Sequence, residues 1–204
     1  MNKRFVFGPV ASRRLGVSLG VDLVTPKTCS LNCVYCEAGE TTRLTLERGN
    51  YVDCERVIAE LEDTLASHPK LDFITFSGAG EPTLNAGIGQ VARYLKRHYP
   101  EYPICLLTNA CAFEDDGLLT EIADIDLVVP SLDASSEEEF REINRPAPGM
   151  TFARLLAGLR KFCAATRAKV YLELFIVPGV NDSDESIARF AELVKTLKID
   201  KVQL

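Results

Sequence analysis

Between Val17 and Val24 the chain alternates between apolar residues and small or polar ones. Valine or leucine occupies every odd position, while Ser18, Gly20 and Asp22 lie between them. A period of two residues is typical of a β-strand whose two faces differ. We expect the apolar face to pack against helices and the small, polar face to stay open toward a ligand.

Beyond residue 50 the hydrophobic pattern switches repeatedly between helical and strand-like spacing. Apolar residues recur at helical spacing over 53–67, where Asp53 is placed to cap the helix, and Ser136 is placed to cap a helix over 137–143. Further helices are predicted around 88–95, 118–122, 152–165 and 184–197, and strands at 71–76, 104–107, 125–129, 169–177 and from about 201. Strands that alternate with helices indicate right-handed βαβ units and a parallel sheet.

The number of these units limits the fold. About six βα units cannot close the usual eight-stranded barrel. We therefore predict an α/β fold, a partial and open TIM-type barrel of about six parallel βα units. No linker or repeat divides residues 1–204, so they are expected to form one domain. The sequence ends at Leu204, inside the expected sixth strand, and we expect this domain to lack C-terminal residues.

Composition narrows the class of protein. The 204 residues are 47% apolar and 25% charged, which is typical of a soluble globular protein. No apolar run reaches the roughly 18 residues of a membrane span, and residues 1–6 lack a signal-peptide core. We expect a cytoplasmic protein without membrane contact. The net charge of −6 does not support nucleic acid as a partner, because nucleic-acid-binding proteins are usually basic.

Three of the seven cysteines, Cys29, Cys33 and Cys36, lie in one short stretch. In a chain without an export signal, cysteines indicate metal binding or reduced thiols rather than disulfides. Soft thiolates select iron–sulfur clusters or zinc, and this spacing suits a loop around one face of an iron–sulfur cubane. Three cysteines for four irons leave one iron without a protein ligand. Catalytic metal sites keep a coordination position open in the same way.

A structural zinc site is the alternative. Zinc in such a site normally takes four protein ligands, and neither His68 nor His98 lies near the cysteines in the sequence. Cys54 could be a distant fourth ligand. The default for the cysteines outside the stretch is a small buried apolar residue: Cys54, Cys105, Cys111 and Cys163.

The stretch 28–36 (TCSLNCVYC) resembles the signature loop of the radical S-adenosylmethionine (SAM) superfamily. The segment 8–16 (GPVASRRLG) is similar to a subgroup of uncharacterised iron–sulfur oxidoreductases near the wyosine-base-forming tRNA enzymes. The resemblance implies a [4Fe–4S] cluster on Cys29, Cys33 and Cys36, with SAM on the fourth iron. It also implies that one electron from the reduced cluster splits SAM into methionine and a 5′-deoxyadenosyl radical, which takes hydrogen from the substrate. Members of this family usually continue beyond the length of this chain.

The expected SAM contacts lie at predicted strand ends, where the functional groups of parallel α/β folds gather. Gly80 and Glu81 begin a Gly-Glu-Pro motif that resembles the family's Gly-Gly-Glu-Pro motif, with Ala79 in place of the first glycine. The resemblance implies that this backbone accepts a hydrogen bond from the SAM amino group, and that a glycine clears space for the ligand. It also places Ser131 against the SAM carboxylate and makes Asp133 a ribose candidate. Turn formation and helix capping are the structural alternatives.

Three further polar or aromatic residues are candidates for the same site. Tyr35, between the last two cysteines, is expected to pack beside the adenine or the cluster and shield it from solvent. Asn109 and Asn181 occupy strand ends equivalent to that of Ser131 and are expected to face the cofactor or the substrate.

Charged residues offer possible substrate contacts. Glu173 lies between two leucines on a predicted strand, so its carboxylate would point into the barrel, which is costly unless it is paired. We hold it as a contact for a polar substrate or cofactor. Arg13 and Arg14 are candidates for a phosphate or carboxylate of the substrate, and an ordinary surface salt bridge is the alternative.

Together these features predict a radical SAM oxidoreductase or transferase with an unidentified substrate, small or macromolecular. No residue is singled out as catalytic. The reaction requires an electron donor such as flavodoxin or ferredoxin. The alternative function is a non-catalytic iron–sulfur protein that transfers electrons or carries clusters, although a carrier normally surrounds its cluster with four protein ligands.

Overall fold

The computed structural model describes residues 4–12, 14–24 and 27–204. Its main sheet has seven strands in the order β1–β2–β5–β6–β7–β8–β9. The strands are β1 (Val6–Ser12), β2 (Gly16–Val21), β5 (Phe73–Phe76), β6 (Ile104–Thr108), β7 (Leu127–Pro130), β8 (Lys169–Glu173) and β9 (Lys201–Gln203). β1 is antiparallel to β2, and the six strands from β2 onward are parallel to their neighbours. The predicted α/β fold with an open parallel sheet is confirmed.

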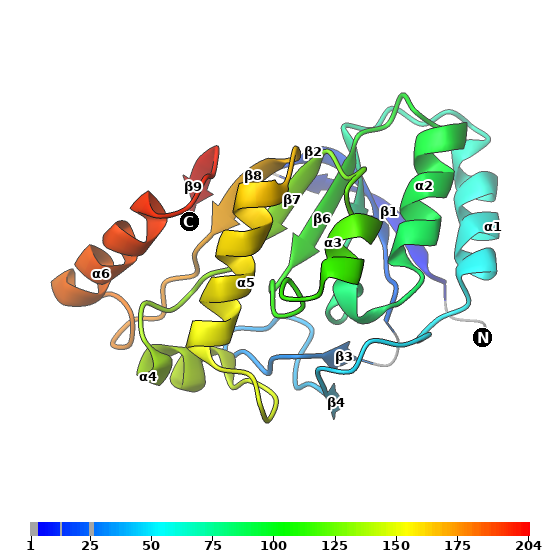
Figure 1. Cartoon of the computed structure of the whole chain (residues 1–204). Helices are drawn as coiled ribbons and strands as arrows, with labels where there is room; N and C mark the ends of the chain where they lie inside the picture. The colour runs from blue at the N-terminus through cyan, green and yellow to red at the C-terminus, as the bar shows by residue number, and fades with distance from the viewer. Residues whose placement is uncertain (1–3, 13, 25–26) are drawn as a thin grey trace.

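Helices connect the parallel strands, and Figure 1 shows α1, α2, α3 and α5 along one face of the sheet. The helices are α1 (Cys54–Leu65), α2 (Ile88–His98), α3 (Asp116–Glu121), α4 (Glu137–Glu139), α5 (Phe152–Ala165) and α6 (Asp184–Lys195), with a 3₁₀ turn η1 (Pro82–Leu84) and a π-helical turn η2 (Phe140–Asn144). Both predicted caps are confirmed, because Asp53 accepts a hydrogen bond from the Glu55 N–H and Ser136 from the Glu139 N–H. Among the described residues, no helix has the length and apolar character to cross a membrane.

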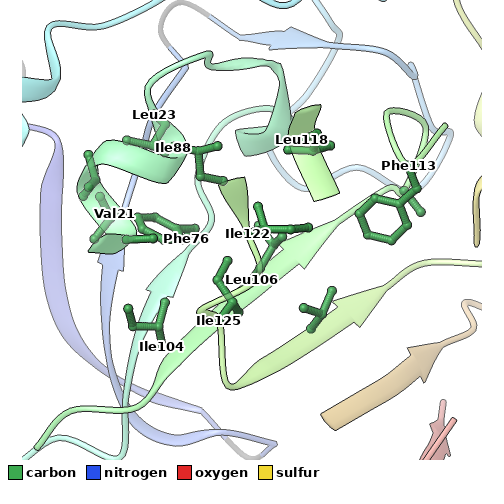
Figure 2. Packing of buried hydrophobic residues seen from close by; sticks show 14 of the residues in the cluster. Val21, Leu23, Phe76, Ile88, Ile104, Leu106, Phe113, Leu118, Ile122 and Ile125 are labelled. Carbon is green, nitrogen blue, oxygen red and sulfur yellow. The ribbon is translucent and has the colours of Figure 1, made fainter. Parts of the chain in front are cut away.

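The main core lies between these helices and the sheet face that they cover. In β6, Ile104 and Leu106 belong to this core, whereas Cys105 and Leu107 belong to a smaller cluster on the other face of the sheet. Figure 2 shows the main core packed from strands and helices together: Val21, Leu23, Phe76, Ile88, Leu118, Ile122 and Ile125. Full burial of one such side chain contributes about 1.5–3 kcal/mol, so this layer holds the sheet in the geometry that the site needs.

The first strand, β1, was not predicted, and it changes the role of β2. Its segment contains a Gly-Pro pair and its register against β2 shifts between Phe7 and Val10, which removes the alternating pattern. The Phe7 ring covers Gly20 so closely that an added Cβ there would lie 2.1 Å from it. Ser18 is buried, with its Oγ 2.5 Å from Thr75 Oγ1. The expectation that the small face of residues 17–24 stays open to a ligand is therefore wrong.

Two predicted elements differ from the prediction near their C-terminal ends, and both differences shape the site. The strand predicted over 169–177 ends at Glu173, so that Phe175 leaves the sheet and its N–H donates to Asp133 Oδ1 at 2.9 Å. The helix predicted over 137–143 becomes a π-helical turn that ends at Asn144, and Arg145 follows with a left-handed φ of 45°. These endings bring Asn144 and Phe175 to the same carboxylate.

Candidate metal and cofactor site

The cysteine loop crosses the carboxyl-terminal side of the parallel strands. It begins at β3 (Thr28–Cys29), which pairs in parallel with β4 (Arg43–Leu44). Figure 1 shows β3 and β4 on the side toward which the arrow of β6 points. On the other flank, the Asn32 N–H donates to the Asn144 carbonyl and the Val34 N–H to the Ile143 carbonyl, both at 2.9 Å. The loop is therefore clamped between β4 and the end of η2.

Each of the three cysteine sulfurs accepts a hydrogen bond from a different N–H donor. Asn109 Nδ2 lies 3.4 Å from Cys29 Sγ, and Asn144 Nδ2 lies 3.3 Å from Cys33 Sγ. The third donor, on the last cysteine, is the ammonium group of Lys27, whose Nζ lies 3.2 Å from Cys36 Sγ. Donors of this kind stabilise sulfur in its thiolate form.

Burial acts in the opposite direction on the first two thiols. It raises the pKa of Cys29 to about 12 and the pKa of Cys33 to about 11. As free thiols these groups keep their protons at neutral pH. A metal that binds them must displace those protons, and the N–H donors then hold the resulting thiolates.

The other cysteines lie elsewhere, as predicted: Cys54, Cys105, Cys111 and Cys163 are all buried. Cys54, the candidate fourth ligand, stands at the start of α1 with its sulfur 3.7 Å from Asn85 Oδ1. Cys111 adjoins the loop, because the Ser30 hydroxyl donates a hydrogen bond to its sulfur. Burial raises the pKa of the Cys111 thiol well above its usual value, which favours a neutral packing role.

The Gly-Glu-Pro turn after β5 packs directly on the cysteine loop. The Glu81 N–H donates to the Thr28 carbonyl oxygen at 3.0 Å, and a Cβ added at Gly80 would lie 2.0 Å from that same oxygen. We expected a glycine here to leave space for a ligand. In the structure, the atom that a side chain at Gly80 would meet first is a backbone oxygen at the start of the cysteine loop.

The Glu81 side chain is buried and makes its hydrogen bonds to neighbouring residues of the protein. It is 2% exposed, and its Oε1 accepts hydrogen bonds from the Thr83 N–H, the Thr83 hydroxyl and the Thr108 hydroxyl. Its Oε2 accepts the Asn109 N–H at 2.7 Å. Burial raises the pKa of Glu81, and these four donors oppose that effect. These contacts do not support a cofactor contact of the Glu81 side chain. Its hydrogen bond to the Asn109 N–H instead fixes Asn109, whose side-chain amide donates to Cys29.

Asp133 is likewise occupied by the protein itself. It is 3% exposed, and its Oδ2 accepts from the Tyr35 hydroxyl at 2.5 Å and from Asn144 Nδ2 at 2.8 Å, while its Oδ1 accepts the Phe175 N–H. Burial raises the pKa of Asp133. The Tyr35 ring stacks on Phe175 with a centroid distance of 4.1 Å and an interplanar angle of 7°. These contacts favour a positioning role for Asp133 over the expected ribose contact, and they place Tyr35 beside Cys33.

Ser131 differs from these residues because its hydroxyl is free. Its backbone forms an isolated bridge to Glu173, and its N–H donates to the Thr108 carbonyl at 2.9 Å. Within the described ranges, its partly buried hydroxyl has no hydrogen-bond partner. The helix-cap alternative does not apply to Ser131, because Ser136 caps α4.

Two other predicted contacts have structural partners. Asn181 is buried and its Nδ2 donates to the carbonyls of Asp133 and Phe175 at 2.7 and 2.8 Å, so it braces a turn. Glu173 lines the inner face of the sheet, which is the face opposite the main core. It forms an ion pair with Arg14, whose side chain is 47% exposed. The two residues line a cavity of about 260 Å³. Arg13 lies outside the described residues.

Sequence reasoning missed Lys27, Asn144 and Phe175. Lys27 immediately precedes the cysteine loop, so its position next to a thiol-rich stretch was a usable signal. Asn144 directly follows the helix predicted over 137–143, and Phe175 lies inside the strand predicted over 169–177. The pattern gave no sign that the helix turns π-helical or that the strand stops at Glu173.

Comparison with known proteins identifies the family. The radical SAM superfamily matches residues 23–191, which include the cysteine loop and the strand ends at Asn109 and Ser131. The chain belongs to the radical SAM superfamily. The expected radical SAM relationship is thereby confirmed.

Relatives of this radical SAM chain differ widely in length. It is 36% identical over 199 residues to a protein of Brachyspira hyodysenteriae named GTPase Obg, covering 98% of this chain and 29% of that protein. It is 33% identical over 200 residues to UPF0026 protein MJ1312 of Methanocaldococcus jannaschii, covering 97% and 62%. It is 31% identical over 207 residues to UPF0026 protein slr1464 of Synechocystis sp., covering 100% and 76%. The chain thus spans less than two thirds of the first two relatives.

Solved structures show the same fold. A radical SAM methyltransferase from Sphaerobacter thermophilus superposes with a TM-score of 0.66 at 20% identity, covering 91% of this chain and 55% of that one. A structure of TYW1 with a lysine–pyruvate adduct superposes with a TM-score of 0.60 at 18% identity, covering 88% and 61%. At this level of identity the likeness supports the fold alone.

The radical SAM family implies a [4Fe–4S] cluster and SAM, and the residues present fit the cluster. Three thiols with separate N–H donors suit ligands of three different irons. In the part of the chain that the structure describes, no three His, Cys, Asp or Glu side chains are grouped to hold a metal ion.

Proposed function

We propose that this chain is the core of a radical SAM enzyme that holds a [4Fe–4S] cluster on Cys29, Cys33 and Cys36. The observation that carries the proposal is the set of three separate N–H donors, one to each of these sulfurs. When bound, the cluster and SAM supply a one-electron cleavage of the SAM carbon–sulfur bond, which gives methionine and a 5′-deoxyadenosyl radical. The electron comes from a one-electron donor of the flavodoxin or ferredoxin class.

In this proposal Ser131 binds the carboxylate of SAM. Its hydroxyl lies at the end of β7 and has no hydrogen-bond partner among the residues that the structure describes. Its backbone is fixed by the bridge to Glu173 and by the Thr108 carbonyl. A fixed backbone leaves only the hydroxyl rotor to be ordered when the ligand binds. A hydrogen bond to a charged group contributes about 1.5–3 kcal/mol.

The surrounding residues position the cluster ligands and exclude water. Glu81 holds Asn109 against Cys29, and Asp133 holds Asn144 against Cys33. Tyr35, within the loop, stacks on Phe175, and this pair shields the cluster from solvent. The backbone of the turn at Gly80, rather than the Glu81 side chain, is left to meet the amino group of SAM.

We place the substrate at the inner face of the sheet. The cavity of about 260 Å³ there combines apolar Leu107 and Val129 with the Arg14–Glu173 ion pair. A substrate with a carboxylate or phosphate would exchange the carboxylate of Glu173 for its own anionic group at Arg14.

The test is an anaerobic reconstitution followed by exposure to SAM and dithionite. We expect iron and sulfide in equal amounts and slow formation of 5′-deoxyadenosine, detected by chromatography. Alanine at Cys29, Cys33 or Cys36 should abolish both, whereas Cys163→Ala, at a buried cysteine of α5, should change neither.

Two results would replace the proposal. An intact and reducible cluster that yields no 5′-deoxyadenosine would favour a non-catalytic iron–sulfur protein. Stoichiometric zinc without sulfide would show that the three cysteines hold a different metal.

A further inference from the structure

We propose that Lys27 sets the reduction potential of the cluster through Cys36. This inference rests on the proposed function, because it requires the cluster on the three cysteines. Lys27 is 8% exposed, and its ammonium group has two described hydrogen-bond acceptors. One is Cys36 Sγ at 3.2 Å from Nζ, and the other is the carbonyl oxygen of Gly39.

A buried ammonium group without a nearby anion is unfavourable. Lys27 forms no salt bridge with a carboxylate among residues 4–12, 14–24 and 27–204, in contrast to lysines such as Lys96, which pairs with Asp126. A thiolate at Cys36 supplies the missing negative charge. The burial of Lys27 is therefore explained by an anionic group at this sulfur, which a bound cluster provides.

The backbone around Lys27 fixes this placement. The carbonyl oxygen of Lys27 accepts hydrogen bonds from the N–H groups of Thr42 and Arg43 at 3.2 and 3.1 Å, and from the Thr42 hydroxyl at 2.9 Å. The Gly39 N–H in turn donates to the Cys36 carbonyl at 3.0 Å. The lysine and the end of the cysteine loop are thus held together by the chain itself.

The other two sulfurs receive a weaker kind of donor. Cys29 and Cys33 are met by the neutral amides of Asn109 and Asn144, at 3.4 and 3.3 Å. Charge-assisted hydrogen bonds are roughly twice as strong as neutral ones. Of the three donors, Lys27 therefore has the strongest electrostatic interaction with the cluster.

That effect has a definite sign. Reduction adds one electron to the cluster and makes it more negative by one charge, without forming or breaking a bond in the protein. A fixed cation beside Cys36 stabilises the reduced cluster more than the oxidised one, and partial burial strengthens the interaction. Lys27 therefore raises the reduction potential and makes the cluster accessible to a weaker electron donor.

The experiment compares reconstituted wild-type protein with Lys27→Gln, which removes the charge and keeps an N–H donor. Lys27→Met removes both, and Lys27→Arg restores the cation. Each protein, free of SAM, is titrated anaerobically with dithionite and redox mediators while the reduced cluster is followed by electron paramagnetic resonance (EPR). Iron and sulfide contents correct for incomplete clusters.

We expect the equilibrium constant for reduction to fall at least tenfold in Lys27→Gln, which lowers the midpoint potential by about 59 mV for one electron. Lys27→Met should fall at least as far, and Lys27→Arg should recover most of the loss. The control is Lys70→Gln, because Lys70 is exposed and precedes β5 at the end of the strand opposite the cysteine loop. Its midpoint should equal that of the wild type.

An assembled cluster in Lys27→Gln with the wild-type midpoint would overturn the proposal and leave Lys27 as a brace of the loop. So would the failure of both neutral variants to hold a cluster while Lys27→Arg holds one, because the lysine would then act on assembly. A wild-type protein with a normal cluster but no 5′-deoxyadenosine would contradict the proposed enzyme activity without affecting this measurement.

Discussion

Ser131→Ala separates cofactor binding from folding at a single hydroxyl. The hydroxyl is partly buried and has no hydrogen-bond partner within the described chain, so its removal breaks no internal contact. Loss of a hydrogen bond to the SAM carboxylate costs about 1.5–3 kcal/mol, which weakens SAM binding about tenfold to a hundredfold. The free energy of unfolding should stay within about 0.5 kcal/mol of the wild type.

The assay is an anaerobic equilibrium titration of the reconstituted protein with SAM, beside a urea unfolding curve of the same sample. The matched control is Ser136→Ala, since Ser136 caps α4 by accepting the Glu139 N–H. This variant should lose about 1 kcal/mol of stability and keep its SAM affinity. Normal SAM binding in Ser131→Ala, with or without a loss of stability, would refute the assignment of Ser131 to the cofactor.

Two further predictions concern the framework. Burial raises the pKa of Glu139, but hydrogen bonds from the Ser135 N–H, Ser186 and Arg189 outweigh it and lower that pKa. Glu139→Gln should therefore lower the free energy of unfolding, measured with urea at pH 7, by about 1–3 kcal/mol. The difference from the wild type should vanish as the pH falls through the lowered pKa of Glu139, and a difference that persists in acid would contradict this. Gly80→Ala places a methyl group against a backbone carbonyl, so it should lower the yield of reconstituted cluster; full reconstitution would show that the loop can move away.

Much of the framework could be predicted from the sequence because its cues are local. Helical spacing predicted α1 and α5 to within a residue or two, and Asp53 caps α1 as expected. The three cysteines could likewise be singled out by spacing alone. Functional groups of parallel sheets gather at the carboxyl ends of the strands, and this rule placed Asn109 and Ser131 on the correct side of the sheet.

The sequence did not show the contacts that join residues distant along the chain. Asp133 was predicted as a ribose contact, and in the structure its oxygens accept hydrogen bonds from donors up to 98 residues away. At Gly80 we expected space for a ligand, yet a side chain there would meet the Thr28 carbonyl oxygen. No local pattern reports such contacts, because they depend on how separate loops pack at the end of the sheet.

The central claim is a [4Fe–4S] cluster with three protein ligands and one iron that is open to SAM. Its most direct test is the EPR spectrum of the reduced, reconstituted protein recorded with and without SAM. Binding of SAM to the open iron should change the spectrum in the wild type, and the signal should be absent from Cys36→Ala. A wild-type spectrum that saturating SAM leaves unchanged would contradict the account.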